Sequence, residues 1–219
     1  MPPYSLAIFD FDGTLADSWR LMGRAIVEAA DRFGYRAPSA EEAEALRGLD
    51  NRAVMKALGV RVWQLPAIAT HMRAVAAEQA GEVRLFDGID TMLRTLHDGG
   101  VSIAVVSSNA EATIRRVLGP DLADVVTAYA CGASLFGKAR KFTRVVKRLG
   151  VEPAQAIAIG DEARDIEAAG TAGVASGAVM WGYATRDLLV SCRPTHVFES
   201  VDDIVTTLVP LSRSERSRG

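Results

Sequence analysis

The chain has 219 residues, of which 49% are hydrophobic, so it can bury a sizeable core and is not a disordered chain. Its 25 basic and 27 acidic residues leave a net charge of −2, which gives no basic footprint for nucleic acid. No apolar stretch approaches the length that a membrane-spanning helix needs.

Short apolar runs alternate with amphipathic segments along most of the chain, which predicts buried strands separated by helices. The predicted strands are Leu6–Phe9, Ile103–Val106, Val125–Tyr129, Ala156–Ile159, Ala178–Met180 and Thr195–Phe198. The predicted helices are Ala110–Leu118, Ala139–Leu149, Ala163–Ala172, Thr185–Leu189 and Val201–Leu208. Apolar strands with short connections to helices are typical of an α/β fold, here a doubly wound parallel sheet with right-handed crossovers.

Residues 18 to 85 break this alternation, because they carry helical periodicity and no convincing strand. The segment is rich in Ala, Glu and Arg, with breaks at Gly34, Gly48, Gly59 and Pro66. An insert of this length is too long for a crossover and fits a small second domain. We therefore predict an α/β core of residues 1–17 and 86–219, with a helical cap domain of residues 18–85 inserted after the first strand.

Two aspartates follow the first predicted strand, in the sequence IFDFDGTLADS. Residues two apart on an extended chain point to the same side, so Asp10 and Asp12 can face one crevice. Gly13 allows a tight turn directly after them. In a parallel sheet, ligands bind in the crevice outside the carboxyl ends of the strands. The sequence therefore places two carboxylates where a ligand is expected.

Two later strand ends carry polar side chains as well. In VVSSN, Ser107 and Ser108 precede a predicted helix, where hydroxyl and N–H groups can bind an anion. In IAIGDEARD, Asp161 follows a strand through a glycine, and Asp161 and Asp165 share one face if a helix begins there. All of these groups would meet at one edge of the sheet.

Carboxylates clustered at one edge repel one another unless a cation neutralises them, and Mg²⁺ is a natural occupant because it prefers oxygen ligands. A metal beside an anion site indicates a phosphate substrate. One carboxylate can then attack phosphorus, and another can protonate the leaving oxygen and later activate water. The phosphoryl group also needs a cation from the protein, for which we favour Lys138, directly after Gly137, with Lys141 as the alternative.

Each motif taken alone has a simpler interpretation. The sequence DGT can build a turn, and the two serines can cap a helix. Asp161 and Asp165 can lie on a solvated helix face, and Lys138 can be a surface lysine. Four such motifs in order, at the strand ends of one sheet, favour a single site over independent coincidences.

The sequences DFDGTLADS, VVSSN, FGK and GDEARDIEAA resemble the four ordered motifs of the haloacid dehalogenase superfamily. The helical insert after the first motif resembles that of its phosphatases with a small helical cap. The later stretch GAVMWGYATRDLL resembles the phosphoglycolate phosphatase-like members. The resemblance covers most of the chain and implies a Rossmann-like core with an inserted cap.

The resemblance implies a role for each carboxylate. Asp10 would be the nucleophile and a Mg²⁺ ligand. Asp12 would be the general acid and base, with its backbone carbonyl on the metal. Asp161 would be the third protein ligand to the metal, and Asp165 would bind nearby or through water.

The resemblance also implies which residues hold the substrate. Ser107 and Lys138 would hold the phosphoryl oxygens, and Thr14 would fix the loop beside them. Ser108 stands where many relatives have Asn, and it is included among the substrate-binding residues.

The sequence LRGLDNR in the insert resembles the family's cap loop that faces the site. Arg47, Asn51 and Arg52 are therefore candidate substrate contacts, since arginine suits a carboxylate or a second phosphate. The alternative is that Arg47 and Arg52 lie on solvated helix ends.

We hypothesise a Mg²⁺-dependent phosphomonoesterase that forms an aspartyl-phosphate and acts on a small phosphorylated metabolite, with phosphoglycolate as the candidate that the resemblance suggests. A phosphosugar mutase of the same fold would instead move phosphate within a sugar. A non-catalytic binding protein of the same fold is a third hypothesis. We predict no nucleic-acid or membrane partner, and the sequence leaves the oligomeric state open.

We expect a cytoplasmic protein. The first motif begins within ten residues of the N-terminus, which leaves no room for a signal peptide. Cys131 and Cys192 are far apart in sequence, and we interpret them as free thiols in a reducing compartment.

Overall fold

A computed structural model of the chain describes residues 3–132 and 137–209. Its main sheet has six strands in the order β5-β4-β1-β6-β7-β8, and every neighbouring pair is parallel. The strands are β1 (Leu6–Phe9), β4 (Ser102–Val105), β5 (Ala128–Tyr129), β6 (Ala156–Gly160), β7 (Ala175–Val179) and β8 (His196–Phe198). The predicted doubly wound α/β fold is confirmed.

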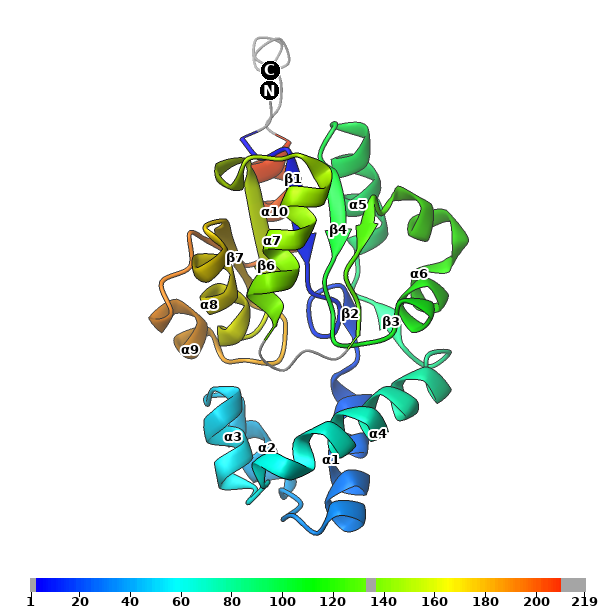
Figure 1. Cartoon of the computed structure of the whole chain (residues 1–219), viewed down its shortest axis with the longest axis vertical. Helices are drawn as coiled ribbons and strands as arrows, with labels where there is room; N and C mark the ends of the chain where they lie inside the picture. The colour runs from blue at the N-terminus through cyan, green and yellow to red at the C-terminus, as the bar shows by residue number, and fades with distance from the viewer. Residues whose placement is uncertain (1–2, 133–136, 210–219) are drawn as a thin grey trace.

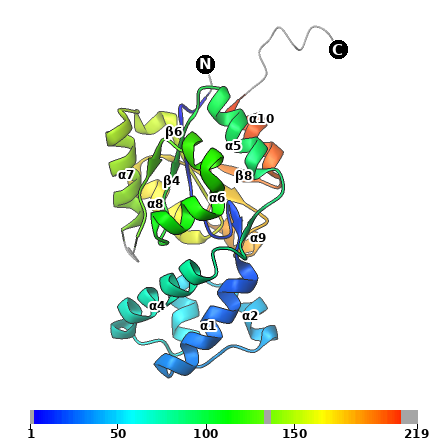
Figure 2. The same cartoon turned by 90° about the vertical axis from the view of Figure 1, so that its right-hand side faces the viewer.

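Helices cover both faces of this sheet (Figure 2). One face packs against α5 (Ile89–Asp98), α6 (Glu111–Val125) and α10 (Val201–Leu208). The other packs against α7 (Lys138–Leu149), α8 (Ala163–Ala172) and α9 (Arg186–Ser191). A sheet with helices on both faces buries both faces of every central strand, which explains the continuous apolar runs in the sequence.

The central strand β1 shows how the sequence serves both layers. Ala7 and Phe9 belong to the core cluster under α5, α6 and α10, whereas Leu6 and Ile8 belong to the cluster under α7 and α8. Successive side chains of a strand point to opposite faces, so one four-residue run supplies both cores. All four side chains are fully buried.

Four helices form within residues 18–85: α1 (Trp19–Phe33), α2 (Ala40–Leu46), α3 (Asn51–Ala57) and α4 (Leu65–Glu78), with a short 3₁₀ turn at Val62–Gln64 before α4. They lie together at one end of the molecule, apart from the main sheet and the helices that cover it (Figure 1). The strands β2 (Ala16–Asp17) and β3 (Arg84–Leu85) pair antiparallel where the chain enters and leaves these helices. The four helices therefore stand over the carboxyl edge of the main sheet.

Of the helix breaks predicted in this segment, Gly34 ends a helix, whereas Pro66 lies inside one. Gly34 ends α1 in the left-handed conformation, which glycine adopts without strain, as predicted. Pro66 does not break a helix, because it occupies the first turn of α4, where a backbone N–H has no partner within the helix.

The largest boundary differences from the prediction involve α6, β5 and β7. The predicted helix Ala110–Leu118 continues as α6 to Val125, across a break at Gly119 whose φ of 75° and ψ of 167° are not helical. The predicted strand Val125–Tyr129 was therefore wrong at its start, and only its last two residues form β5. The predicted strand Ala178–Met180 overlaps the end of β7, which begins earlier at Ala175 and ends at Val179, so Met180 lies outside it.

Strands β2 and β3, helix α5 and the 3₁₀ turn Pro153–Gln155 are absent from the prediction. Strands β2 and β3 have two residues each, too short to carry a periodicity. Helix α5 does carry one, since its buried residues Ile89, Met92, Leu93 and Leu96 have helical spacing. Within residues 3–132 and 137–209, no helix has the length and apolarity to cross a membrane.

Candidate active site

The four sequence motifs converge at the carboxyl edge of the main sheet. Asp10 directly follows β1, Ser107 follows β4, and Asp161 directly follows β6. Lys138 is the first residue of α7. Strand β1 lies between β4 and β6 in the sheet. Asp10, Ser107 and Asp161 are therefore neighbours although they are far apart in the sequence. This is where a doubly wound sheet binds ligands.

Three buried carboxylates form a compact cluster. Asp10, Asp161 and Asp165 each offer an oxygen, and these oxygens lie within 4.8 Å of one another. Asp161 Oδ1 accepts a 2.8 Å hydrogen bond from Thr14 Oγ1, and its Oδ2 accepts one of 2.8 Å from the Tyr183 N–H. Helix α8 begins at Ala163, as predicted, so Asp161 lies before it and does not share a helix face with Asp165. The two carboxylates of this motif meet nevertheless.

The cluster carries more negative charge than its surroundings neutralise. Burial raises the pKa of Asp161 well above its usual value, and the charges of Glu162, Asp10 and Asp165 raise it further. Burial, together with Asp10, also raises the pKa of Asp165 to about 6, although Lys138 opposes this. Buried oxygens that are reluctant to ionise together are a set that a hard divalent cation would stabilise.

Lys138 is the cation that contacts this cluster. Its ammonium lies 2.6 Å from Asp10 Oδ2 and also pairs with Asp165. Burial lowers the pKa of Lys138, but the two carboxylates outweigh it, so the net pKa is raised. Lys141 points elsewhere and donates to the carbonyls of Ser107, at 2.8 Å, and Gly132, at 2.6 Å. Phe136 of this motif lies outside the described residues.

Asp12 has a separate environment, although it is two residues from Asp10. Its Oδ1 accepts a hydrogen bond from Ser18 Oγ at 2.9 Å, and its Oδ2 accepts one from Asn109 Nδ2 at 2.8 Å. The Tyr183 hydroxyl lies 2.5 Å from Ser18 Oγ. Burial, followed by the charge of Asp10, raises the pKa of Asp12 to about 6. A carboxyl group with this pKa can both give and take a proton near neutral pH.

The serines of the second motif differ in position. Ser107 is buried, and its Oγ accepts a 3.0 Å hydrogen bond from the Asn109 N–H. Ser108 is exposed and lines the cavity beside the cluster. Helix α6 begins only at Glu111, so the loop of residues 107–110, rather than a helix start, surrounds Ser107.

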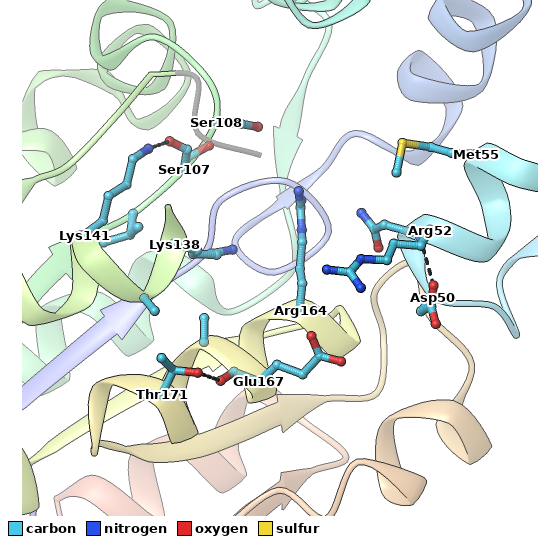
Figure 3. Close-up of a pocket in the computed structure, with 14 residues that line it drawn as sticks. Asp50, Arg52, Met55, Ser107, Ser108, Lys138, Lys141, Arg164, Glu167 and Thr171 are labelled. Atoms are coloured by element: carbon cyan, nitrogen blue, oxygen red, sulfur yellow. Dashed lines mark hydrogen bonds between the residues drawn. The ribbon is translucent and has the colours of Figure 1, made fainter. Parts of the chain in front are cut away.

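A cavity of about 510 Å³ is lined by Lys138, the residue that pairs with Asp10 and Asp165 (Figure 3). The core contributes Ser107, Ser108 and Lys138 to its wall, and α3 contributes Asn51 and Arg52. The structure thus brings two of the three predicted cap residues to the same cavity as the motif residues.

Arg47 is not among the residues that line this cavity. Its Nε donates to the Tyr183 carbonyl at 2.8 Å, and its Nη2 donates to the Gly182 carbonyl at 3.3 Å. The guanidinium also lies over the Trp19 ring, 5.3 Å from its centroid. Arg47 therefore joins the inserted helices to the loop after β7.

Small residues make room for the carboxylate of Asp161. A side chain at Gly182 would place its Cβ 2.1 Å from Asp161 Cβ, and one at Gly13 would place it 2.2 Å from Asp161 Oδ2. Gly13 also has a φ of +75°, in the region that favours glycine. The loops around Asp161 therefore tolerate no larger residue at these two positions.

Gly182→Ala is expected to displace Asp161 and to weaken severalfold the binding of a divalent cation by the acidic cluster, because the methyl group has no space. A calorimetric titration with Mg²⁺ measures this. Gly170→Ala is the matched control, since nothing lies within 4 Å of a Cβ there. Identical titrations for Gly182→Ala and the unsubstituted chain would contradict this account of Asp161.

Three residues at the site were not predicted. Asn109 is the last residue of the quoted VVSSN, and it is one position beyond the serines that were chosen. Arg164 lies inside the fourth motif and lines the cavity. Tyr183 lies in the stretch that resembles the phosphoglycolate phosphatase-like members, where no pattern distinguishes a residue beside a carboxylate from one in the core.

The chain is similar to known proteins over most of its length. Residues 7–179 match the family model described as haloacid dehalogenase-like hydrolase. The chain is 29% identical over 207 residues to a phosphoglycolate phosphatase of Synechococcus elongatus, which covers 94% of this chain and 98% of that protein. It is also 29% identical over 188 residues to the tyrosine-protein kinase PtkA of Mycobacterium tuberculosis, over 84% of this chain and 65% of the kinase.

A solved structure shares the fold at lower sequence identity. A predicted phosphatase from Clostridium acetobutylicum superposes with a TM-score of 0.80 at 21% identity, over 95% of this chain and 99% of that one. Its similarity extends across both the main sheet and the inserted helices, since it spans nearly the whole chain.

Proposed function

Because the chain belongs to the haloacid dehalogenase-like hydrolase family, we propose that it is a Mg²⁺-dependent phosphomonoesterase acting on a small phosphorylated metabolite such as phosphoglycolate. The observation that carries the proposal is the pairing of a buried Asp10 with Lys138 beside two further carboxylates. A nucleophile, a cation for the phosphoryl group and a set of oxygen ligands then occupy one site.

The residues present fit a divalent cation. Asp10, Asp161 and Asp165 supply oxygens within 4.8 Å of one another, and their charge is only partly neutralised by Lys138. We assign these three side chains, together with the backbone carbonyl of Asp12, as the ligand set for Mg²⁺. When bound, the ion would neutralise charge on the phosphoryl oxygens.

The first step would belong to Asp10 and Asp12. A carboxylate oxygen of Asp10 attacks phosphorus, the bond from phosphorus to the ester oxygen breaks, and its electron pair goes to the leaving oxygen. Asp12 gives its proton to that oxygen, which releases the alcohol. The pKa of Asp12, raised to about 6, supports this role because part of the population is protonated near neutral pH.

The second step would use the same residues in reverse. Asp12, now a carboxylate, takes a proton from water as the water attacks the phosphorus of the aspartyl-phosphate. The bond from phosphorus to Asp10 breaks, inorganic phosphate forms, and the Asp10 carboxylate is restored. Ser107 and Lys138 would hold the phosphoryl oxygens in both steps, and Thr14 would keep Asp161 in place through its hydrogen bond.

We also propose that residues 18–85 are a cap domain over a core of residues 1–17 and 86–219. The contacts of Arg47 with the loop at Gly182 and Tyr183, and the place of Asn51 and Arg52 at the cavity, support this division. A cap over the cavity would exclude water while the substrate reacts and would choose among substrates by their fit.

Lys138→Ala is expected to lower kcat/KM by about 10²- to 10³-fold, because it removes the charge beside the phosphoryl group. Lys141→Ala is expected to lower it less, since the Lys141 ammonium is held by two backbone carbonyls and its role is to fix the loop. Steady-state kinetics of the two variants side by side measure the difference. A larger loss in Lys141→Ala would transfer the phosphoryl contact to that lysine.

The proposed function is tested by phosphate release from an aryl phosphate, 2-phosphoglycolate and sugar phosphates, with and without Mg²⁺. Metal-dependent release of inorganic phosphate supports a phosphomonoesterase. Migration of phosphate within a sugar, faster than its release to water, would identify a mutase instead. No turnover of any ester, with tight binding of one of them, would favour a binding protein.

A further inference from the structure

One arginine at the cavity has no role in the steps described above. Arg164 belongs to α8 and lies in sequence between Asp161 and Asp165, two of the proposed metal ligands. Its side chain lines the cavity with those of Lys138 and Arg52. Its side chain is 32% exposed, so part of it is open to the cavity. Arg164 Nη2 donates to Glu162 at 2.8 Å.

The rest of this guanidinium is uncommitted. Arg164 Nε is buried and finds no hydrogen-bond partner among the described residues. A buried donor without a partner costs free energy, and charged donors cost more than neutral ones. Nε itself is closed to the cavity, so a ligand oxygen would meet the exposed part of the Arg164 side chain instead.

A second arginine faces the same space from the inserted helices. Arg52, on α3, and Arg164, on α8, extend into the cavity from opposite sides (Figure 3). Two like charges that share a cavity repel each other, and an anion between them would remove that repulsion. Four cationic side chains line the cavity, against two acidic ones: Arg52, Lys138, Lys141 and Arg164 against Asp50 and Glu167.

Of the other charged groups in the wall, Lys138, Lys141 and Asp50 have partners, whereas the exposed Glu167 carboxylate makes no hydrogen bond or ion pair with the described residues. Lys138 pairs with Asp10, and Lys141 donates to two carbonyls. Asp50 accepts from the N–H groups of Arg52 and Ala53 at the start of α3. Arg52 and Arg164 are thus the cationic side chains in the wall that still have N–H groups for a ligand. They could bind a group of the substrate other than the reacting phosphate.

We infer that Arg164, with Arg52, binds a second anionic group on the leaving-group side of the substrate, a carboxylate or a second phosphate. This inference rests on the proposed function and narrows its substrate class. Arg164 and Lys138 line one cavity, so the second anion would be joined to the reacting phosphate by a short chain. Planar guanidinium groups bind both kinds of anion through two parallel hydrogen bonds.

The test compares three esters with a short two-carbon leaving group: 2-phosphoglycolate, ethylene glycol bisphosphate and 2-hydroxyethyl phosphate. The unsubstituted chain is expected to prefer at least one of the first two over the third, which has no second anion. Arg164→Gln is expected to reduce that preference, as a ratio of kcat/KM values, by about tenfold. Arg164→Lys, which keeps the charge, is expected to retain part of it.

The ratio of kcat/KM values distinguishes loss of a contact with the second anion from a general disturbance of the active site. If Arg164→Gln merely disturbed Asp161 and Asp165, all three esters would lose the same factor and the ratio would not change, which would overturn the inference. Arg148→Gln, at an exposed position on α7, is the matched control for loss of an arginine.

The unsubstituted chain gives an independent answer that no variant's folding can obscure. Equal kcat/KM values for the three esters would overturn the inference and leave the phosphomonoesterase intact. A preference for 2-phosphoglycolate alone, or for the bisphosphate alone, supports the inference and identifies the second anion. No release from these esters or from an aryl phosphate would overturn the proposed function and this inference together.

Discussion

Asp10→Asn is expected to abolish phosphate release, with a loss of about 10⁴-fold or more, while the fold is retained. The amide has the size of the carboxylate but cannot attack phosphorus. The substitution also removes one of three mutually repelling carboxylates, so the thermal stability of the protein should not fall greatly. Phosphate release and thermal unfolding, measured on the same preparation, check both parts of this result.

Asp17→Asn is the matched control for this substitution. Asp17 lies on β2, a few residues further along the chain, and its side chain is exposed. The control should keep the activity of the unsubstituted chain. Turnover by Asp10→Asn within tenfold of that activity would exclude Asp10 as the nucleophile.

Asp12→Asn is expected to lower turnover of an alkyl phosphate by about 10²- to 10⁴-fold, because it removes the group that moves the protons. The loss should be smaller for formation of the intermediate from p-nitrophenyl phosphate, whose leaving oxygen needs little help from an acid. Rapid-mixing measurements of p-nitrophenol release, beside steady-state release of phosphate from alkyl esters, separate the two steps.

The contrast between leaving groups is what distinguishes acid catalysis from a structural role. Asp12 accepts hydrogen bonds from Ser18 and Asn109, so its substitution could also disturb these contacts. Such a disturbance would slow both kinds of ester alike. Equal losses would therefore contradict the assignment of Asp12 as the acid.

The core of the fold and the motif residues could be predicted because local chemistry dictates them. A buried parallel strand must be apolar throughout, and β1 and β6 were identified on that ground. Polar residues directly after such strands must lie at the carboxyl edge of the sheet. The convergence of Asp10 and Asp161 follows from that rule and the order of the strands, and Lys138 joins them from the start of α7.

The remaining site residues depend on contacts between segments far apart in the sequence. Tyr183 reaches Ser18 across 165 positions, and Asn109 reaches Asp12 across 97. Nothing in the local sequence of either residue indicates its partner. Arg47 illustrates the same limit, since an arginine in the loop that faces the site donates to backbone carbonyls of the core rather than lining the cavity.

The prediction missed the short strands and the end of α6 for a different reason. Strands β2 and β3 have two residues each and owe their pairing to the point where the chain leaves the core and returns to it. The predicted helix Ala110–Leu118 stops at the break at Gly119, but the chain resumes helical geometry beyond this break as far as Val125, which leaves β5 shorter than predicted. Packing against the sheet, which the local sequence does not encode, decides between stopping and resuming.

The measurement that tests the central claim most directly is the mass of the intact chain after acid quench during turnover of an aryl phosphate. The account predicts a phosphoryl adduct on Asp10 that forms only with Mg²⁺, is lost on treatment with hydroxylamine, and is absent in Asp10→Asn. Steady turnover by the unsubstituted chain with no adduct at any quench time, together with an active Asp10→Asn, would contradict a covalent aspartyl-phosphate.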